Sequence, residues 1–260
     1  MDLGLQGKVA LVSAASKGLG YGVARALATD GARVSICSRD DATISVAAAK
    51  LTEETHAEVI YSACDVTQAA DIQAWVDQTV EQWGTIDALL INAGGPPAGL
   101  IKDLTDAQWQ AAFDLTLMST IRLIRAALPH MKNGGSILTI TSSSIKEPIE
   151  RLGLSTVMRS GVAGLVKTLA DELAGDNIRV NNLIPGRIAT DRVAQLDAGA
   201  AQRSGKSIEQ VRADSIAKIP LKRLGTIDDF GAAAAFLLSP AASYITGASL
   251  RVDGGAMRSI

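Results

Sequence analysis

A cluster of hydroxyl groups is the first feature of this chain that could support chemistry. Ser142, Ser143 and Ser144 directly follow residues 137–140, an apolar run typical of a buried strand. From Gly153 apolar residues recur at spacings of three and four, which predicts a helix over residues 153–173. Open α/β sheets bind ligands at the carboxyl ends of their strands. We therefore expect the functional site at these hydroxyls.

A second candidate site follows the first predicted strand. There the sequence Ala14-Ala15-Ser16-Lys17-Gly18-Leu19-Gly20 leads into a helix. Glycines at such a turn let the backbone approach a pyrophosphate, and the helix N-terminus supplies N–H groups and a positive dipole end. The turn predicts a dinucleotide site, although a glycine-rich turn can also serve packing alone.

The end of the second predicted strand bears on which dinucleotide would bind. An NAD site places Asp or Glu there, on the ribose hydroxyls. This chain has Ser38 and Arg39 instead, with Lys17 in the glycine turn. Two cations and no carboxylate suit a 2′-phosphate and favour NADP(H). The alternative is two solvated surface cations.

Strands and helices alternate along the whole chain. Strands are predicted at 8–13, 34–37, 58–63, 86–91, 137–140, 178–184 and 250–252, and the helices between them at 41–53, 68–82, 105–131, 153–173 and 226–238, after a first one that ends at Leu27. Such alternation implies a parallel sheet with helices on both faces.

No repeat or linker divides the chain. We expect residues 1–260 to form a single doubly wound, Rossmann-type α/β domain with about seven strands. Residues 187–220 are polar and are expected to be a substrate-loop insertion within it. Capping boxes at Thr105 and Ser207 predict helix starts.

Composition excludes several classes of protein. The chain has 260 residues, 47% of them apolar, and a net charge of −2, which gives no electrostatic case for nucleic acid or an anionic membrane. It contains neither an apolar run long enough to span a membrane nor a signal-peptide pattern. We expect a cytoplasmic protein without a metal ion, in which Cys37 and Cys64 are free buried thiols.

Seven short motifs follow one another in a fixed order: residues 13–20, 65–66, 92–94, 178–181, 185–190, 245–247 and 252–255. Through these motifs the chain resembles, over essentially its whole length, the short-chain dehydrogenase/reductase family. The resemblance is to the type of member that includes many oxoacyl-carrier-protein reductases. The resemblance implies cofactor contacts from Ser13, Ala15, Ser16, Lys17, Gly18, Leu19, Gly20, Asp65, Val66, Asn92, Ala93, Gly94, Pro185, Gly186, Ile188 and Thr190. Ala14 stands where the family has its first glycine, which is tolerable only with a negative φ.

The resemblance weakens at the catalytic residues. The family uses a Ser, a Tyr, a Lys and an Asn on the preceding helix; here Ser142 fits the first, and Ser155, Arg159 and Thr116 stand at the other positions. An aliphatic hydroxyl is far less acidic than a phenol, whose pKa is about 10. Ser155 is therefore not expected to shuttle a proton, and Arg159 can bind a ribose but stays protonated. Lys146 is the best replacement acid, the alternative being a solvated loop lysine.

These residues leave three functions open. The first is an NADP(H)-dependent oxidoreductase of the short-chain type that acts on a carbonyl or alcohol through an atypical site. The others are a lyase or isomerase on the same scaffold and a nucleotide-binding protein without turnover. Arg187, Asp191 and Arg192 flank the predicted substrate loop and could grip an anionic substrate or form surface ion pairs.

The helix predicted over residues 153–173 also bears on assembly. It is apolar nearly all round, with Gly161 and Gly164 for close approach, and such a helix is normally buried. We therefore expect a homo-oligomer, a tetramer or a dimer.

Overall fold

The strands form one parallel sheet at the centre of the molecule. The structure is a computed structural model that describes residues 2–259. The strand order is β3-β2-β1-β4-β5-β6-β7, and every neighbouring pair is parallel. The strands are β1 (Val9–Ser13), β2 (Arg33–Ser38), β3 (Val59–Ala63), β4 (Ala88–Ile91), β5 (Gly135–Ile140), β6 (Ile178–Pro185) and β7 (Ser249–Val252). The predicted parallel sheet is confirmed, and its order reverses between β1 and β4, where such sheets bind ligands.

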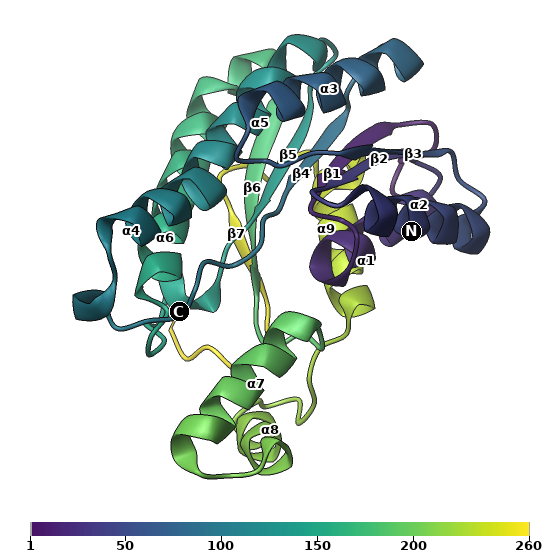
Figure 1. Ribbon diagram of the computed structural model, residues 1–260. Helices are drawn as coiled ribbons and strands as arrows, with labels where there is room; N and C mark the ends of the chain where they lie inside the picture. The colour runs from purple at the N-terminus through teal and green to yellow at the C-terminus, as the bar shows by residue number, and fades with distance from the viewer. Residues whose placement is uncertain (1, 260) are drawn as a thin grey trace.

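Helices cover both faces of this sheet (Figure 1). One layer contains α1 (Gly18–Thr29), α2 (Asp41–Thr55) and α9 (Ile227–Leu238), and the other α3 (Ala69–Trp83), α5 (Ser119–Ala127) and α6 (Gly153–Glu172). In β1, Ala10 and Val12 pack under the first layer, whereas Val9 and Leu11 pack under the second. Alternate side chains of a strand point to opposite faces, so burial on both sides explains the continuous apolar runs.

The helix predicted over residues 105–131 is interrupted. Its capping box at Thr105 is confirmed and starts α4 (Asp106–Phe113), but a π-helical turn, η2 (Asp114–Met118), separates α4 from α5. Ser119 and Thr120 in this region donate to the carbonyls of Leu115 and Thr116. Single π-turns inside helices often occur at functional sites. This one buries Thr116 beside α6.

The polar stretch 187–220 contains two helices, of which the sequence signalled only the second. They are α7 (Asp191–Ser204) and α8 (Ile208–Ala217), the latter started by the predicted capping box at Ser207. Both lie apart from the two helical layers, below the sheet in Figure 1. A bridge between Ile188 and Gly225 joins the two ends of this α7–α8 segment.

The long helix α6 is not apolar all round. Ser160, Lys167 and Asp171 lie on its exposed face. A Cβ at Gly161 would lie 3.2 Å from a methyl group of Leu117 in the same chain, so the close approach at Gly161 is to η2. The expectation that this helix is apolar nearly all round was therefore wrong. The oligomeric state stays a prediction.

Two further features concern residues 2–259. No helix in this range is long and apolar enough to cross a membrane. Cys37 and Cys64 are free and buried, as expected.

Candidate active site

The turn between β1 and α1 offers a site for an anion. Gly18 has φ +62°, and a Cβ at Gly20 would lie 2.4 Å from the carbonyl oxygen of Ala14, so both positions require glycine. Lys17, the N-cap of α1, gives no side-chain cap, and the first turn carries no acidic residue. The N-terminal N–H groups of α1 are therefore free to bind a pyrophosphate.

Ala14 adopts a left-handed conformation with φ +50°, so the expected negative φ was wrong. Two hydrogen bonds hold the turn in place. Ala15 N donates to Cys37 O over 3.0 Å, and Asn92 Nδ2 donates to Ala14 O over 3.3 Å. A non-glycine residue in this region costs on the order of 1 kcal/mol, which the surrounding contacts must offset.

Ser13 and Asn92 join β1 to β4 at the point where the strand order reverses. Ser13 Oγ donates to Asn92 O over 2.8 Å and accepts from Asn92 N over 2.9 Å. This fixes the start of the loop Asn92-Ala93-Gly94, and a Cβ at Gly94 would meet nothing within 4 Å. The loop therefore borders open space at the carboxyl edge of the sheet.

The end of β2 presents a cation, and the carboxylate that directly follows it is engaged. Arg39 is exposed, and Asp40 Oδ1 accepts from Thr43 N over 2.8 Å as the N-cap of α2. Hydrogen bonds from Thr43 hold the pKa of Asp40 below its ordinary value. Beyond β3, Asp65 Oδ1 accepts from Thr67 N over 2.9 Å and Val66 is buried.

The predicted catalytic residues lie at the carboxyl end of β5 and the start of α6. Ser142 is the N-cap of η4 (Ser143–Ile145), and its Oγ accepts from Ser144 N over 3.1 Å. Ser155, in the first turn of α6, is buried. Arg159, one turn further, is 8% exposed, and its Nη1 donates to Ile140 O over 2.6 Å.

The guanidinium of Arg159 is a buried charge. Burial, together with the positive charge of Arg192, lowers its pKa to about 10. The group is still protonated at pH 7. It therefore places a fixed positive charge beneath the site, and it cannot act as an acid or base there.

Three other hydroxyls near this edge are buried and have no hydrogen-bond partner among the described residues. They are Thr116 Oγ1 on η2, Thr141 Oγ1 directly after β5, and Ser144 Oγ on η4. Buried hydroxyls are normally paired. These groups are therefore available to a ligand or to water, and of the three, only Thr141 was missed by the sequence analysis.

Lys146 and Glu147 lie on the loop after η4. Lys146 is exposed, which agrees with the reading as a solvated lysine and leaves its role as an acid a prediction. Glu147 Oε1 accepts from Arg258 N over 2.7 Å and from Ser259 N over 2.9 Å. Glu147 therefore ties the C-terminal tail to the loop that carries Lys146.

The segment after β6 lies against the glycine turn. A Cβ at Gly18 would lie 3.7 Å from Thr190 Cγ2, and Lys17 Nζ lies 2.6 Å from Asp191 Oδ2. A phosphate site needs a free cation, whereas Lys17 is paired with Asp191 in this structure. The pair is largely exposed, and such pairs contribute about 0–1 kcal/mol, so a phosphate group can displace Asp191.

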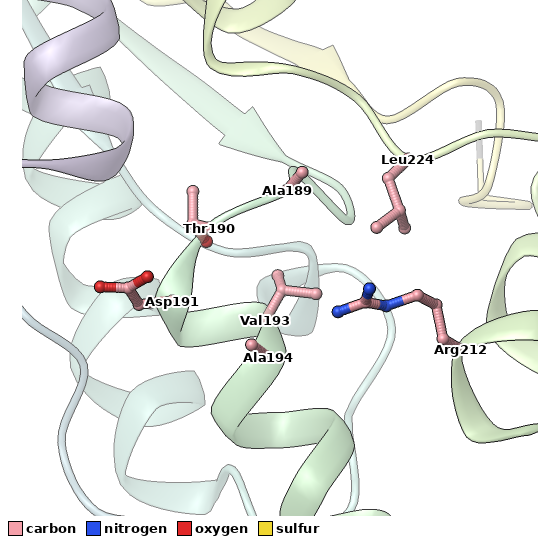
Figure 2. Close-up of a pocket in the computed structure, with 7 residues that line it drawn as sticks. All are labelled: Ala189, Thr190, Asp191, Val193, Ala194, Arg212 and Leu224. Atoms are coloured by element: carbon pink, nitrogen blue, oxygen red, sulfur yellow. The ribbon is translucent and has the colours of Figure 1, made fainter. Parts of the chain in front are cut away.

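A cavity of about 250 Å³ lies beside the first turn of α7. Figure 2 shows Thr190, Asp191 and Val193 on one side of it and Arg212 reaching in from α8. Arg212 Nε lies 3.7 Å from Oδ2 of the buried Asp197, which also pairs with Arg187. Sequence reasoning missed Asp197, because nothing in a polar stretch distinguishes a buried carboxylate from a solvated one.

Known proteins of similar sequence identify the family. Residues 13–257 match the family model described as Enoyl-(Acyl carrier protein) reductase. Short-chain dehydrogenase/reductase SDRA of Arabidopsis thaliana is 34% identical over 252 residues, covering 96% of this chain and 95% of the relative. The chain belongs to the short-chain dehydrogenase/reductase family.

Solved structures of similar proteins agree over nearly the whole length. L-sorbose reductase from Gluconobacter frateurii, crystallised with NADPH and L-sorbose, is 29% identical with a TM-score of 0.95, and the match covers 100% of both chains. YwfH, an NADPH dependent reductase involved in bacilysin biosynthesis, is 30% identical with a TM-score of 0.92, covering 98% of this chain and 100% of that one.

The tyrosines of this short-chain dehydrogenase/reductase lie outside the segment that carries Ser142 and Ser155. Tyr21 is in α1 and donates to Glu54 over 3.0 Å, Tyr61 is in β3, and Tyr244 lies fully exposed beyond α9. A phenol is therefore not part of η4, the following loop or α6 in this member of the family.

Proposed function

We propose that this protein is an NADP(H)-dependent oxidoreductase that interconverts a carbonyl and an alcohol. The observation that carries the proposal is the free N-terminus of α1 beside a cluster of buried hydroxyls and one buried cation. Two structural relatives are described with NADPH, which supports the choice of cofactor. When bound, the cofactor supplies or accepts the hydride.

The chain's own residues supply binding and electrostatics. Ser142 and Ser155 donate hydrogen bonds to the substrate oxygen, and the positive charge of Arg159 favours negative charge on the bound substrate. The proton comes from water or from Lys146. A positioned general acid contributes roughly 10²–10⁴-fold to the rate. Because the usual phenol is absent from this site, we expect reduction to be slower here than in other members of the family.

Arg39 selects the cofactor. Ser38 leaves room at the ribose 2′ position, and the neighbouring Asp40 is engaged in capping α2. We expect NADPH to bind at least about tenfold more tightly than NADH, a difference that one charge-assisted contact to phosphate supplies. Fluorescence titration with both reduced cofactors measures this, and Arg39→Glu should abolish the preference. The exposed Arg203→Glu on α7 is the matched control, and equal affinities in the wild type would refute NADP(H) selection.

Turnover is tested separately from binding. NADPH oxidation with a panel of aldehydes, ketones and oxo acids should give slow but saturable rates. Lys146→Met removes most of the rate if the lysine donates the proton and leaves it unchanged if water does. NADPH binding without any turnover would favour the alternative of a nucleotide-binding protein, for which the loss of a phenol at the site is the supporting observation.

A further inference from the structure

Two guanidinium groups lie against the same short loop at the carboxyl edge of the sheet. Arg159 Nη2 lies 3.5 Å from Ala93 O, and Arg192 Nη2 donates to Pro96 O over 3.2 Å. Gly95 lies between them, and a Cβ there would come within 3.0 Å of Arg192 Nη2. The glycine therefore gives Arg192, from the first turn of α7, room to approach the loop.

Neither guanidinium has an acidic partner within the part of the chain that the structure describes. Three acidic groups on the adjoining segments are already engaged: Asp191 pairs with Lys17, Asp197 with Arg187 and Arg212, and Glu147 with the tail backbone.

The guanidinium groups of Arg159 and Arg192 interact electrostatically. The charge of Arg192 contributes to the lowered pKa of Arg159, so they lie close enough to repel. A buried charge is normally paired, and two like charges around one loop are unfavourable until an anion neutralises them. The arrangement therefore suits a bound carboxylate, which guanidinium groups hold through two parallel hydrogen bonds.

We propose that the substrate is an oxo acid whose carboxylate binds to Arg192 and Arg159 while its carbonyl lies at Ser142 and Ser155. This inference rests on the proposed oxidoreductase function for the reacting carbonyl. The cofactor's own anions have other places, namely the free N-terminus of α1 for the pyrophosphate and Arg39 for the 2′-phosphate. Arg192 is consequently the residue that selects acids over neutral ketones.

Matched acid and ester pairs test the proposal. Benzoylformate with its methyl ester and acetoacetate with its ethyl ester place the carboxylate at two distances from the carbonyl. Binding to the protein with NADP⁺ is measured by calorimetry, and turnover by NADPH oxidation. In the wild type at least one acid should bind about 10- to 100-fold more tightly than its ester, as expected for hydrogen bonds to a charged group.

The variant Arg192→Gln should remove that difference while leaving the affinity for the ester within about twofold. Arg203→Gln, on the exposed side of the same helix, should behave as the wild type. Gly95→Ala reports on the same contact without changing any charge, because its methyl group would lie 3.0 Å from Arg192 Nη2 and push the guanidinium aside by a few tenths of an ångström. It should weaken acid binding in the same direction.

The outcomes separate this inference from the proposed function. Acids that bind without being reduced would refute the redox proposal and uphold the carboxylate site. Reduction of esters as efficiently as acids would refute the carboxylate site and uphold the redox proposal. A loss of NADPH affinity in Arg192→Gln, equal to its loss of acid affinity, would assign the anion to the cofactor and overturn the inference.

Discussion

Replacing Asp197 by alanine should loosen the α7–α8 segment far more than it destabilises the rest of the protein. The carboxylate is 1% exposed and lies between the guanidinium groups of Arg187 and Arg212, whose side chains are 31% and 47% exposed. Removing one partner of a fully buried ion pair costs about 3–5 kcal/mol. Because both arginines reach water, we expect about 2–3 kcal/mol here.

That cost should appear as local opening. The two helices pack against each other and return to the sheet at the bridge between Ile188 and Gly225, so they can open without exposing the core around β1. About 2–3 kcal/mol corresponds to a roughly 30- to 160-fold rise in the opening equilibrium. Hydrogen exchange followed by mass spectrometry should show this loss of protection in peptides from residues 187–217, while β1 and β5 stay protected.

Two variants sharpen the test. Asp197→Asn keeps the shape and one acceptor, so it should cost less than the alanine. Asp214→Ala removes a carboxylate from an exposed pair with Lys206 in the same segment and should leave exchange unchanged. Unaltered exchange over residues 187–217 in Asp197→Ala, or an equal loss of protection in the central strands, would refute the idea that Asp197 holds this segment to the domain.

The remaining predictions concern the site and the assembly. Ser155→Tyr combined with Arg159→Lys should speed carbonyl reduction if the pocket still performs hydride chemistry, and a slower or unchanged reductase in steady-state assays would favour a reshaped pocket. Ala14→Gly should raise the free energy of unfolding in urea by about 0.5–1 kcal/mol, because it relieves a left-handed alanine at some cost in chain entropy. Because the pKa of Arg159 is lowered to about 10, its positive charge persists from pH 6 to 9 and is lost as the pH rises through 10. The affinity for the oxo acid, measured by calorimetry, should therefore stay level up to pH 9 and then fall. A decline beginning near pH 7 would contradict the assignment of the carboxylate to Arg159. Light scattering at micromolar concentration should give the mass of a dimer or tetramer, and a monomer would refute the predicted assembly.

Much of the architecture could be read from the chain alone. The alternating apolar runs required a parallel sheet covered on both faces, because strands such as β1 are buried on both sides and connections between parallel strands need helices. The capping boxes at Thr105 and Ser207 marked two helix starts, since their hydrogen bonds are local. The glycine turn and the position of Ser142 were predictable for the same reason: strand ends and turn chemistry depend on neighbours in sequence.

The tertiary structure decided what depends on distant neighbours. Ala14 takes a positive φ because bonds to Cys37 on β2 and to Asn92 directly after β4 hold the turn. The pKa of Arg159 is lowered because α6 buries the guanidinium against β5 and α7 brings Arg192 near. Asp197, on α7, is buried between the guanidinium groups of Arg187, which precedes the helix, and Arg212, on α8. Burial and electrostatic coupling are properties of groups that meet in space, and the spacing of residues along a chain does not specify which of its charges will meet.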